Sequence, residues 1–338
     1  MDQNLTGYSF RIAECRNVRT GEHFAMKIMK NKFYSQNLRE AKILTQLKNL
    51  NLHESNIVNF SECFSYKDRT CFVYEKLEKT LSELIFAANG TPFHLSEIRG
   101  IAYQTLVALN SLNNSGFTHA NIKPENIMCT DGISQDSGVK LIGFSNSAKT
   151  SDLCDLEIPV ACGYTAPEVL LDGPLDESLD IWSLGCTLAF LFLGQHMSPV
   201  DCEYQFMRFI VNQGSVYIST TVHNDLTSLD DLFKQNQNEP MDYLDTEAFI
   251  DLLKNMLKVN PADRIKPADA LNHPFITMSH LRFTPSKLYK TLSQKIMADC
   301  NYTKQQNVNT SLSTPTSDRE ITPGLHFSRI GAFRSKSA

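Results

Sequence analysis

Apolar and polar residues alternate in two short segments near the start of the chain, YSFRIAECRNV at residues 8–18 and EHFAMKIMK at residues 22–30. A Thr-Gly dipeptide at residues 20–21 separates them. Alternation on both sides of a glycine-containing turn is typical of a β-hairpin, because successive side chains of a strand point to opposite faces. We therefore expect a hairpin over residues 8–30.

Further along the chain the alternation gives way to helical spacing. LREAKILTQLKNL (38–50) carries apolar residues at the spacing of an amphipathic helix. VNFSECFSYKDRTCFVYEKL (58–77) indicates two more strands joined by a charged turn, and helical patterns follow from about residue 80. One of these helices opens with Ser-x-x-Arg at residues 96–99 rather than with a capping box. LGCTLAFLFLG (184–194) is too short to span a bilayer, so it predicts a buried helix.

These patterns predict an α+β protein with two lobes. Residues 1–77 are expected to form a small β-rich lobe, residues 78–282 a larger helical lobe, and a cleft is expected between them. Residues 283–338 are polar and rich in Ser and Thr. From residue 286 onward they hold eight Lys or Arg and three Asp or Glu. This composition predicts a disordered, mildly basic tail.

Composition narrows the class of protein further. The chain has 338 residues, of which 42% are hydrophobic, and its net charge is −5, so no global basic field favours nucleic acid. Its nine cysteines include no Cys-x-x-Cys pair, which fits reduced thiols in an intracellular protein better than a disulfide framework. The N-terminus has no basic segment followed by an apolar one, so we expect no signal peptide.

Several segments resemble those of protein kinases both in amino-acid sequence and in their order along the chain, and together they cover about residues 5–282. These segments are FAMK, REAKIL, HANIKPENIM, GYTAPEVLL, LDIWSLGCTL and NPADRIKPADALNHPFI. The segments HA, PENIM and FIDLLKNML resemble the corresponding segments of the homeodomain-interacting protein kinases, which belong to the CMGC group. The resemblance implies the bilobal kinase fold, with ATP and Mg²⁺ used to phosphorylate serine or threonine.

The resemblance assigns a phosphate-binding role to the first lobe. Lys27 would contact the α- and β-phosphates and pair with Glu40 on the following helix. A glycine-rich loop would cover the phosphates at residues 5–10, but LTGYSF keeps only Gly7. Phe10 stands where the third glycine would let backbone N–H groups approach phosphate.

The purine would bind where the lobes join. By resemblance, the hinge is Glu75-Lys76-Leu77, and its backbone groups would bond the adenine. Tyr74 would be the gatekeeper that precedes the hinge. Ala25 and Met128 would lie on the two faces of the adenine, although both residue types are also ordinary in a core.

Two carboxylates that the chemistry would need are missing. Asn121 stands where the catalytic aspartate would accept the substrate proton, and an amide cannot take up a proton at neutral pH. Gly143 stands where an aspartate would bind Mg²⁺, and Ser145 replaces the following glycine. Lys123 and Asn126 remain, for the γ-phosphate and a second metal. Asn126 is a weak ligand on its own, which puts Mg²⁺ binding in doubt and leaves ATP binding open.

The scaffold of the larger lobe is complete by the same resemblance. Glu168 and Arg264 would form a buried ion pair, and Asp180 would bond the backbone of the catalytic loop. Ile158 stands where a phosphorylated tyrosine would lie in the activation segment, so switching by phosphorylation there is not expected. Tyr164 is kept.

Three functions stay open from the sequence. The first is a pseudokinase that regulates by binding partners, such as substrates or regulators of an active related kinase. The second is an active serine/threonine kinase of low or unusual activity. The third is a nucleotide-sensing module that holds ATP without metal. Nucleus or cytoplasm is the expected location, with the nucleus favoured by resemblance alone, and neither direct nucleic-acid binding nor a membrane is expected.

Overall fold

The N-terminal hairpin forms where the alternation predicts it. In the computed structural model, β1 (Phe10–Arg16) pairs antiparallel with β2 (His23–Lys30) over seven residues of each strand. Gly21 takes a φ of 78° in the turn, a left-handed conformation that glycine adopts without strain. The structure describes residues 10–30, 34–130, 138–196, 229, 243–283, 286–311 and 334–335.

Two further strands extend this sheet. β3 (Phe60–Tyr66) and β4 (Arg69–Glu75) form a second antiparallel hairpin, whose two turn residues, Lys67 and Asp68, have φ of 43° and 55°. Two successive left-handed residues suit a tight hairpin turn, because their twist matches that of the strands. The strand order is β3-β4-β2-β1-β9, where β9 (Arg334–Ser335) pairs with the end of β1.

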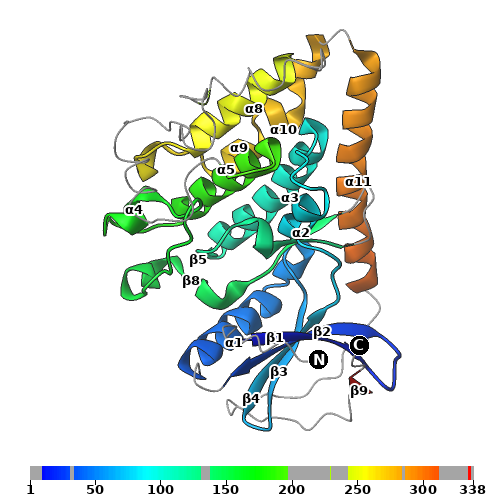
Figure 1. Cartoon of the computed structure of the whole chain (residues 1–338), viewed down its shortest axis with the longest axis vertical. Coiled ribbons are helices and arrows are strands. Elements are labelled where there is room, and N and C mark those ends of the chain that lie inside the picture. The colour runs from blue at the N-terminus through cyan, green and yellow to red at the C-terminus, as the bar shows by residue number, and fades with distance from the viewer. Residues whose placement is uncertain are drawn as a thin grey trace.

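Helix α1 (Tyr34–Asn49) packs against β3 and β4 and begins four residues before the predicted start of the pattern. Its buried face carries Ile43, Leu44 and Leu47 together with the carboxylate of Glu40. The short 3-10 helix η2 (Leu52–Glu54) follows and leads into β3. These elements form the smaller lobe at the bottom of Figure 1.

The larger lobe is mainly helical. Its helices are α2 (Leu81–Ala87), α3 (Leu95–Asn114), α4 (Pro167–Leu170), α5 (Ser178–Leu193), α8 (Tyr243–Met256), α9 (Pro267–Leu271), α10 (Pro274–Thr277) and α11 (Lys287–Ser311). Its short strands are β5 (Phe117–Thr118), β6 (Ile127–Cys129), β7 (Val139–Leu141) and β8 (Ala148–Lys149). Its 3-10 helices are η3 (Pro124–Asn126), η4 (Phe144–Asn146), η5 (Thr150–Asp155), η7 (Pro261–Asp263) and η8 (Ser279–Phe283).

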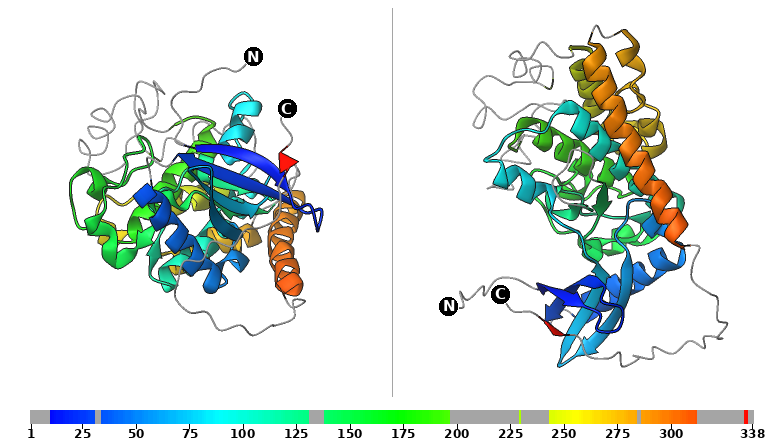
Figure 2. Two further views of the ribbon diagram at one scale, coloured as in Figure 1. Left: turned by 90° about the horizontal axis from the view of Figure 1, so that it is seen from below. Right: turned by 90° about the vertical axis from the view of Figure 1, so that its right-hand side faces the viewer.

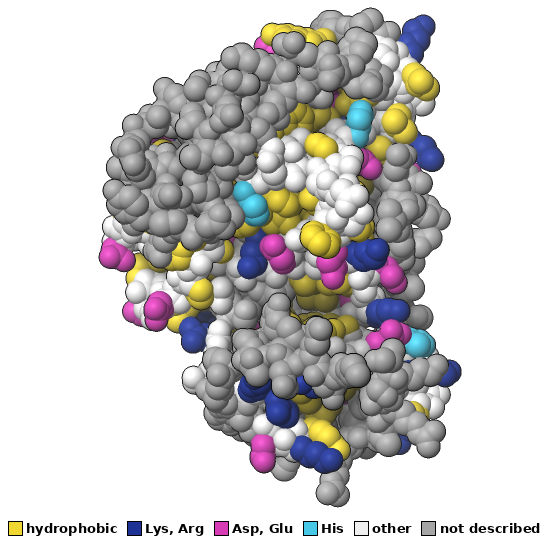
Figure 3. Space-filling view, in the orientation of Figure 1, with side chains coloured by type: hydrophobic (Ala, Val, Ile, Leu, Met, Phe, Trp, Pro, Cys, Tyr) yellow, Lys and Arg dark blue, Asp and Glu magenta, His cyan; other side chains and the backbone are white. Residues whose placement is uncertain are grey.

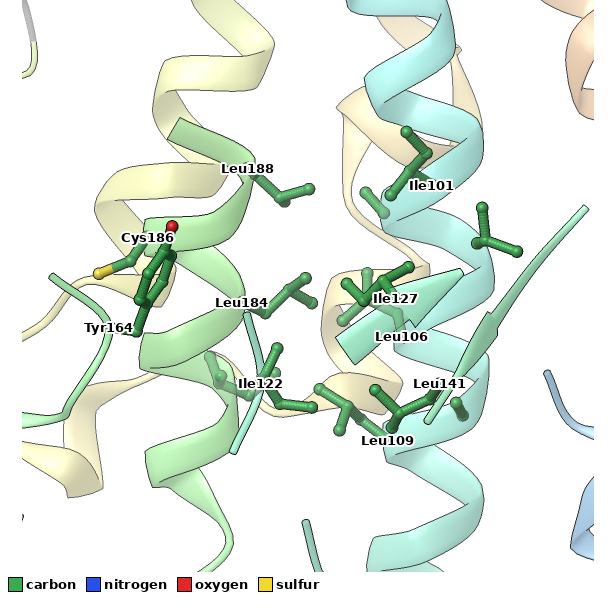
Figure 4. Close-up of a cluster of buried hydrophobic side chains, with 14 of the residues drawn as sticks. Ile101, Leu106, Leu109, Ile122, Ile127, Leu141, Tyr164, Leu184, Cys186 and Leu188 are labelled. Carbon is green, nitrogen blue, oxygen red and sulfur yellow. The ribbon is translucent and has the colours of Figure 1, made fainter. Parts of the chain in front are cut away.

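The core of this lobe lies between α3 and α5. Apolar side chains of the two helices point toward each other, with the β6–β7 hairpin beside them (Figure 4). The buried residues at this contact include Leu106, Leu109, Ile127, Leu184 and Leu188. The predicted α+β fold with two lobes is therefore confirmed, and so is the buried helix predicted from residue 184.

One prediction about a helix start is wrong. Helix α3 does have a capping box: the Glu97 side chain accepts from the backbone N–H of His94, whose ring accepts from Ser96 N. The sequence pattern placed the start at Ser96, whereas the N-cap is His94, and histidine is not among the usual capping residues.

The predicted disordered tail is wrong for Lys287–Ser311, which form α11. The helix packs along α3 and reaches η2, so it runs from the far end of the larger lobe to the junction with the smaller one (Figure 2). Ile296, Met297 and Cys300 are buried, and the Tyr289 hydroxyl donates to Asp245 of α8. Few bulky apolar residues suffice here because their helical spacing gathers them on one face.

Two predictions from the sequence fall outside the described residues. They are the position of Gly7 and the tail over residues 312–333 and 336–338. Within the described part of the chain, no helix is long and apolar enough to cross a membrane. Acidic and basic side chains both lie along the junction of the lobes on the face shown in Figure 3, so charge of one sign does not dominate there.

Candidate active site

Lys27 and Glu40 meet in the smaller lobe. The Lys27 ammonium lies 2.7 and 2.9 Å from the two carboxylate oxygens of Glu40, and both residues are buried. The strand β2 carries the lysine and the helix α1 carries the glutamate, so the pair fixes the helix against the sheet. Tyr74 adds a third group, because its hydroxyl donates to Glu40 Oε1 at 3.3 Å. Burial, and then the Glu40 charge, raise the pKa of Tyr74.

Two residues of β1 lie on the same face as Lys27. The register places Ile12 opposite Lys27 and Phe10 opposite Met29. The Lys27 ammonium lies 5.3 Å from the centre of the Phe10 ring, on its face. Ile12 is 61% exposed. Neither Ile12 nor this contact was predicted from the sequence, although alternation in phase with Lys27 could have identified both.

The hinge is held by an ion pair that the sequence did not reveal. Glu75 lies 2.7 and 2.8 Å from the Lys140 ammonium, and it also accepts from the Asn59 backbone N–H at 2.6 Å. Lys140 belongs to β7 of the larger lobe, so this pair ties the two lobes together beside the hinge. Leu77 is buried.

The expected purine-contacting residues lie on different lobes. Ala25 is on β2, two residues before Lys27 and on the same face of the sheet, and it pairs with Tyr74 of β4. Met128 is on β6 of the larger lobe, where it pairs with Lys140. Both are half-buried. An apolar side chain is therefore available on each side of the hinge.

The catalytic loop is fixed by Asp180 of α5. Its carboxylate accepts from the backbone N–H groups of His119 and Ala120 at 2.7 and 2.8 Å, which confirms the predicted contact. Ala120 has a φ of 58°, so this loop is bent into a conformation that most side chains avoid. Burial raises the pKa of Asp180 to about 7, and the two N–H donors oppose that shift.

His119 links the catalytic loop to the following strand and loop. Its Nε2 lies 2.9 Å from the carbonyl oxygen of Ile142, and its Nδ1 accepts from Asn121 N at 3.2 Å. This pattern requires a neutral ring, and complete burial lowers the pKa of His119 to about 4. The ring meets Phe144 edge-on at 4.8 Å between centres. Phe144 is buried, and its 3-10 helix η4 contacts α1.

Asn121 lies in the catalytic loop and is half-buried. Its carbonyl oxygen accepts from Asn126 Nδ2 at 2.8 Å. Lys123, also half-buried, precedes η3. The structure thus brings Asn121, Lys123 and Asn126 together, but the loop offers an amide where a proton acceptor is needed.

Gly143 and Asn126 are in close contact. Gly143 has a φ of 81°, and a Cβ built there would lie 2.4 Å from Asn126 Oδ1 and 2.7 Å from its Cγ. The Asn126 side chain therefore occupies the space that a side chain at residue 143 would need. Its amide nitrogen is committed to the Asn121 carbonyl.

This donor set does not fit a magnesium ion. Mg²⁺ favours carboxylate oxygens in octahedral geometry, whereas this site offers one neutral amide oxygen, that of Asn126, and has no carboxylate at residue 121 or 143. Among the described residues, no group of three His, Cys, Asp or Glu side chains could hold a metal ion. No catalytic step can be assigned to a metal at these residues.

The activation segment is packed against the larger lobe. Ile158 is half-buried against the core cluster, and Tyr164 is buried. Below the segment, Arg264 pairs with Glu168 through contacts of 2.5 and 2.6 Å, which confirms the predicted ion pair. The Arg264 guanidinium also lies 5.1 Å from the centre of the Trp182 ring.

A cavity of about 500 Å³ lies away from this site, between α2, α3 and α11. Its lining is mostly apolar and includes Leu84, Ile101, Ile296 and Cys300. None of the expected site residues lines it. The chemistry of the catalytic and hinge residues is thus separate from this cavity.

Comparisons with known proteins agree with this arrangement. The protein kinase domain family matches residues 6–276. Homeodomain-interacting protein kinase 1 of Caenorhabditis elegans is 33% identical over 320 residues, covering 78% of this chain and 38% of the relative. Homeodomain-interacting protein kinase 2 of Mus musculus is 33% identical over 321 residues, covering 80% and 27%.

A solved kinase domain has the same fold. Its crystal structure aligns with a TM-score of 0.64 and 25% identity, covering 82% of this chain and 93% of that one. The chain spans well under half the length of the two curated relatives above. It belongs to the protein kinase domain family, and it resembles the homeodomain-interacting protein kinases.

Proposed function

We propose that the chain is a pseudokinase, a kinase-fold protein that acts by binding rather than by phosphoryl transfer. The contact between Gly143 and Asn126 carries this proposal. The position that would supply the main metal ligand has no side chain, and the neighbouring asparagine fills the space. Without a metal, the charge that develops on the phosphates lacks its strongest stabilising group.

The amide at Asn121 supports the same conclusion. Loss of a general base costs roughly 10²–10⁴-fold in rate. The metal deficit adds to this loss, although such effects do not simply multiply when groups act as a unit. Phosphoryl transfer depends almost entirely on positioning and charge stabilisation, and both are reduced at the reacting end of this cleft.

Purine binding is a second candidate activity, and the Lys27–Glu40 pair favours it. The pair is formed in this structure, and the hinge is fixed by Glu75 and Lys140. A site that keeps these groups without a metal could sense a purine ligand and shift the lobes in response. This activity is compatible with the binding role.

The partners we propose are proteins, such as substrates or regulators of an active related kinase. The homeodomain-interacting protein kinases supply this suggestion by resemblance, and so does the proposed nuclear location. Because the fold is complete, such a partner would meet a kinase-shaped surface that does not turn over ATP.

Transfer of the γ-phosphate tests the proposal. The purified chain, Lys27→Ala and the double variant Asn121→Asp/Gly143→Asp are incubated with labelled ATP, Mg²⁺ and a generic basic protein substrate. We expect no incorporation above background for the natural chain. Incorporation that disappears in Lys27→Ala would overturn the proposal, because it would mean that the chain is an active kinase.

The double variant needs a control for folding, because a side chain at residue 143 would collide with Asn126. Its thermal unfolding is therefore compared with that of the natural chain before activity is measured. Activity in a folded double variant would locate the defect at the two missing carboxylates. A folded but silent double variant would mean that Asn126 and Phe10 also block the chemistry.

A further inference from the structure

The Lys27 ammonium is enclosed by groups of its own chain. Glu40 contacts it with both carboxylate oxygens, at 2.7 and 2.9 Å. The rings of Phe10 and Phe72 lie 5.3 and 5.7 Å away, measured to their centres. As a result, the Lys27 side chain is only 11% exposed. The cation that would contact nucleotide phosphates is already surrounded.

Phe10 is held in this place by the sheet. It is the first residue of β1 and pairs with Met29 of β2, next to the Ile12–Lys27 pair. An aromatic face attracts a nearby ammonium ion through its quadrupole, so the ring satisfies part of the charge of Lys27. A phosphate group that approached Lys27 from this side would have to displace the ring.

The losses in this cleft are all at its phosphate end. Phe10 covers the ammonium, Asn126 fills the space beside Gly143, and residues 121 and 143 offer no carboxylate to a metal. A triphosphate would therefore enter without a metal, and the Lys27 ammonium would already be engaged by Glu40 and Phe10. Desolvating an unpaired anion is unfavourable, so each phosphate added to a ligand weakens its binding here.

The purine end is different. Ile12, Ala25 and Met128 are apolar and at least partly exposed, and they lie on the elements that flank the hinge. Glu75 is anchored by Lys140, which fixes the position of the hinge backbone. Apolar contact and backbone hydrogen bonds to a purine require neither metal nor phosphate.

We propose that Phe10 determines ligand specificity by closing the phosphate end of the cleft, so that the site accepts adenosine-like ligands without phosphate and excludes ATP. This inference deepens the proposed function, on which it rests, by naming the ligand class of the same site. The Phe10 ring, which is 39% exposed, covers the Lys27 ammonium from one side.

Binding of adenosine and of ATP, measured by isothermal titration calorimetry without Mg²⁺, tests this inference. We expect the natural chain to bind adenosine at least about tenfold more tightly than ATP, a difference of about 1.4 kcal/mol. In Phe10→Ala, ATP binding tightens about tenfold or more, while adenosine binding changes less than about twofold. Phe86→Ala is the matched control, because Phe86 is 85% exposed on α2 and is not one of the residues expected to contact the ligand.

Two further variants keep the test decisive. Phe10→Val preserves the strand preference of the first residue of β1 and removes the ring, so it should gain ATP binding even if Phe10→Ala unfolds. Adding Lys27→Met to either variant should abolish the gain, which shows that the phosphates reach the uncovered ammonium.

Three results would overturn the inference. They are equal binding of ATP and adenosine by the natural chain, no gain of ATP binding on removal of the ring, and no binding of adenosine by any folded variant. None of these bears on phosphoryl transfer, which is measured separately with labelled ATP. Failure of the specificity inference is thereby distinguished from failure of the pseudokinase proposal.

Discussion

The Glu168–Arg264 pair and the Asn126–Gly143 contact belong to the same lobe. They differ in how much folding stability is lost when one charged group is absent. The ion pair is buried, and removal of either member leaves a charge without compensation. Residue 143, where the resemblance implies an aspartate, is a glycine, and the neutral side chain of Asn126 fills the space beside it. The buried charges of the scaffold are present, whereas the two carboxylates expected by resemblance at residues 121 and 143 are absent.

This difference follows from how each group contributes to folding. A carboxylate gathered with others around a metal repels its neighbours when the metal is absent, so its loss favours the folded state. Loss of a carboxylate that is bonded to a buried guanidinium instead destabilises the folded state, because the guanidinium is left without compensation. Variants that act on one region or the other can therefore break or sharpen the comparison.

The largest effect is expected at the ion pair. Arg264→Leu leaves the Glu168 carboxylate buried without its partner and removes the contact with Trp182. We expect the free energy of unfolding to fall by about 3–5 kcal/mol, measured by urea denaturation. Lys76→Ala is the control, since it removes the exposed pair with Glu14 and should leave the value unchanged within error. A small effect of Arg264→Leu would contradict the account of the scaffold.

Helix α11 provides the next comparison. Ile296→Ala removes a buried side chain from the contact with α3, and we expect a loss of about 2–5 kcal/mol of unfolding free energy. Leu288→Ala, on the same helix but 81% exposed, should change it by less than about 0.5 kcal/mol. Equal and negligible effects of the two substitutions would mean that this segment is not part of the folded unit.

The pH dependence of stability tests the catalytic loop. The pKa of His119 is lowered to about 4 from an ordinary value of 6.5. Between these values the unfolded chain binds a proton that the folded chain does not. The stability that His119 contributes is therefore complete above pH 6.5 and is lost as the pH falls toward 4.

Comparison with His119→Phe isolates this effect, because Asp180, with its pKa raised to about 7, acts in the opposite direction in both proteins. The stability advantage of the natural chain over the variant should shrink by about 1.4 kcal/mol for each pH unit below 6.5. The measurement is urea denaturation at pH 7.0, 6.0 and 5.0. A difference that stays constant over this range would show that the His119 ring is protonated in the folded chain.

The smallest effect concerns Gly143. Gly143→Ala forces a left-handed alanine and a contact with Asn126, whereas Gly116→Ala at a φ of 74° has nothing within 4 Å of the new Cβ. Both variants lose about 1–2 kcal/mol of stability from the conformation alone. We expect Gly143→Ala to lose about 1 kcal/mol more, and Asn126→Ala in the same chain to restore that difference. Equal losses would mean that Asn126 moves aside freely.

The sequence predicted the scaffold well because kinase-like segments carry folding information over long stretches. The hairpin over residues 8–30 and the helix ending at Gly194 follow from local pattern and turn chemistry. The Glu168–Arg264 pair followed from resemblance. In each case the residues that must contact one another in the fold are all present in the sequence.

The site was less predictable where a contact joins distant segments through a substituted residue. No pattern at residue 126 or 143 indicates that Asn126 turns into the space beside Gly143. The Lys140–Glu75 pair likewise depends on the register of two short elements 65 residues apart. The α11 helix escaped prediction because its polar composition outweighed the spacing of its few apolar residues.

The position of Asn126 also bears on the history of the site. A reversion that restored aspartate at residue 143 alone would meet a side chain that now occupies its space. Return to catalysis would thus also require the Asn126 side chain to shift, and residue 121 would still offer an amide in place of a carboxylate.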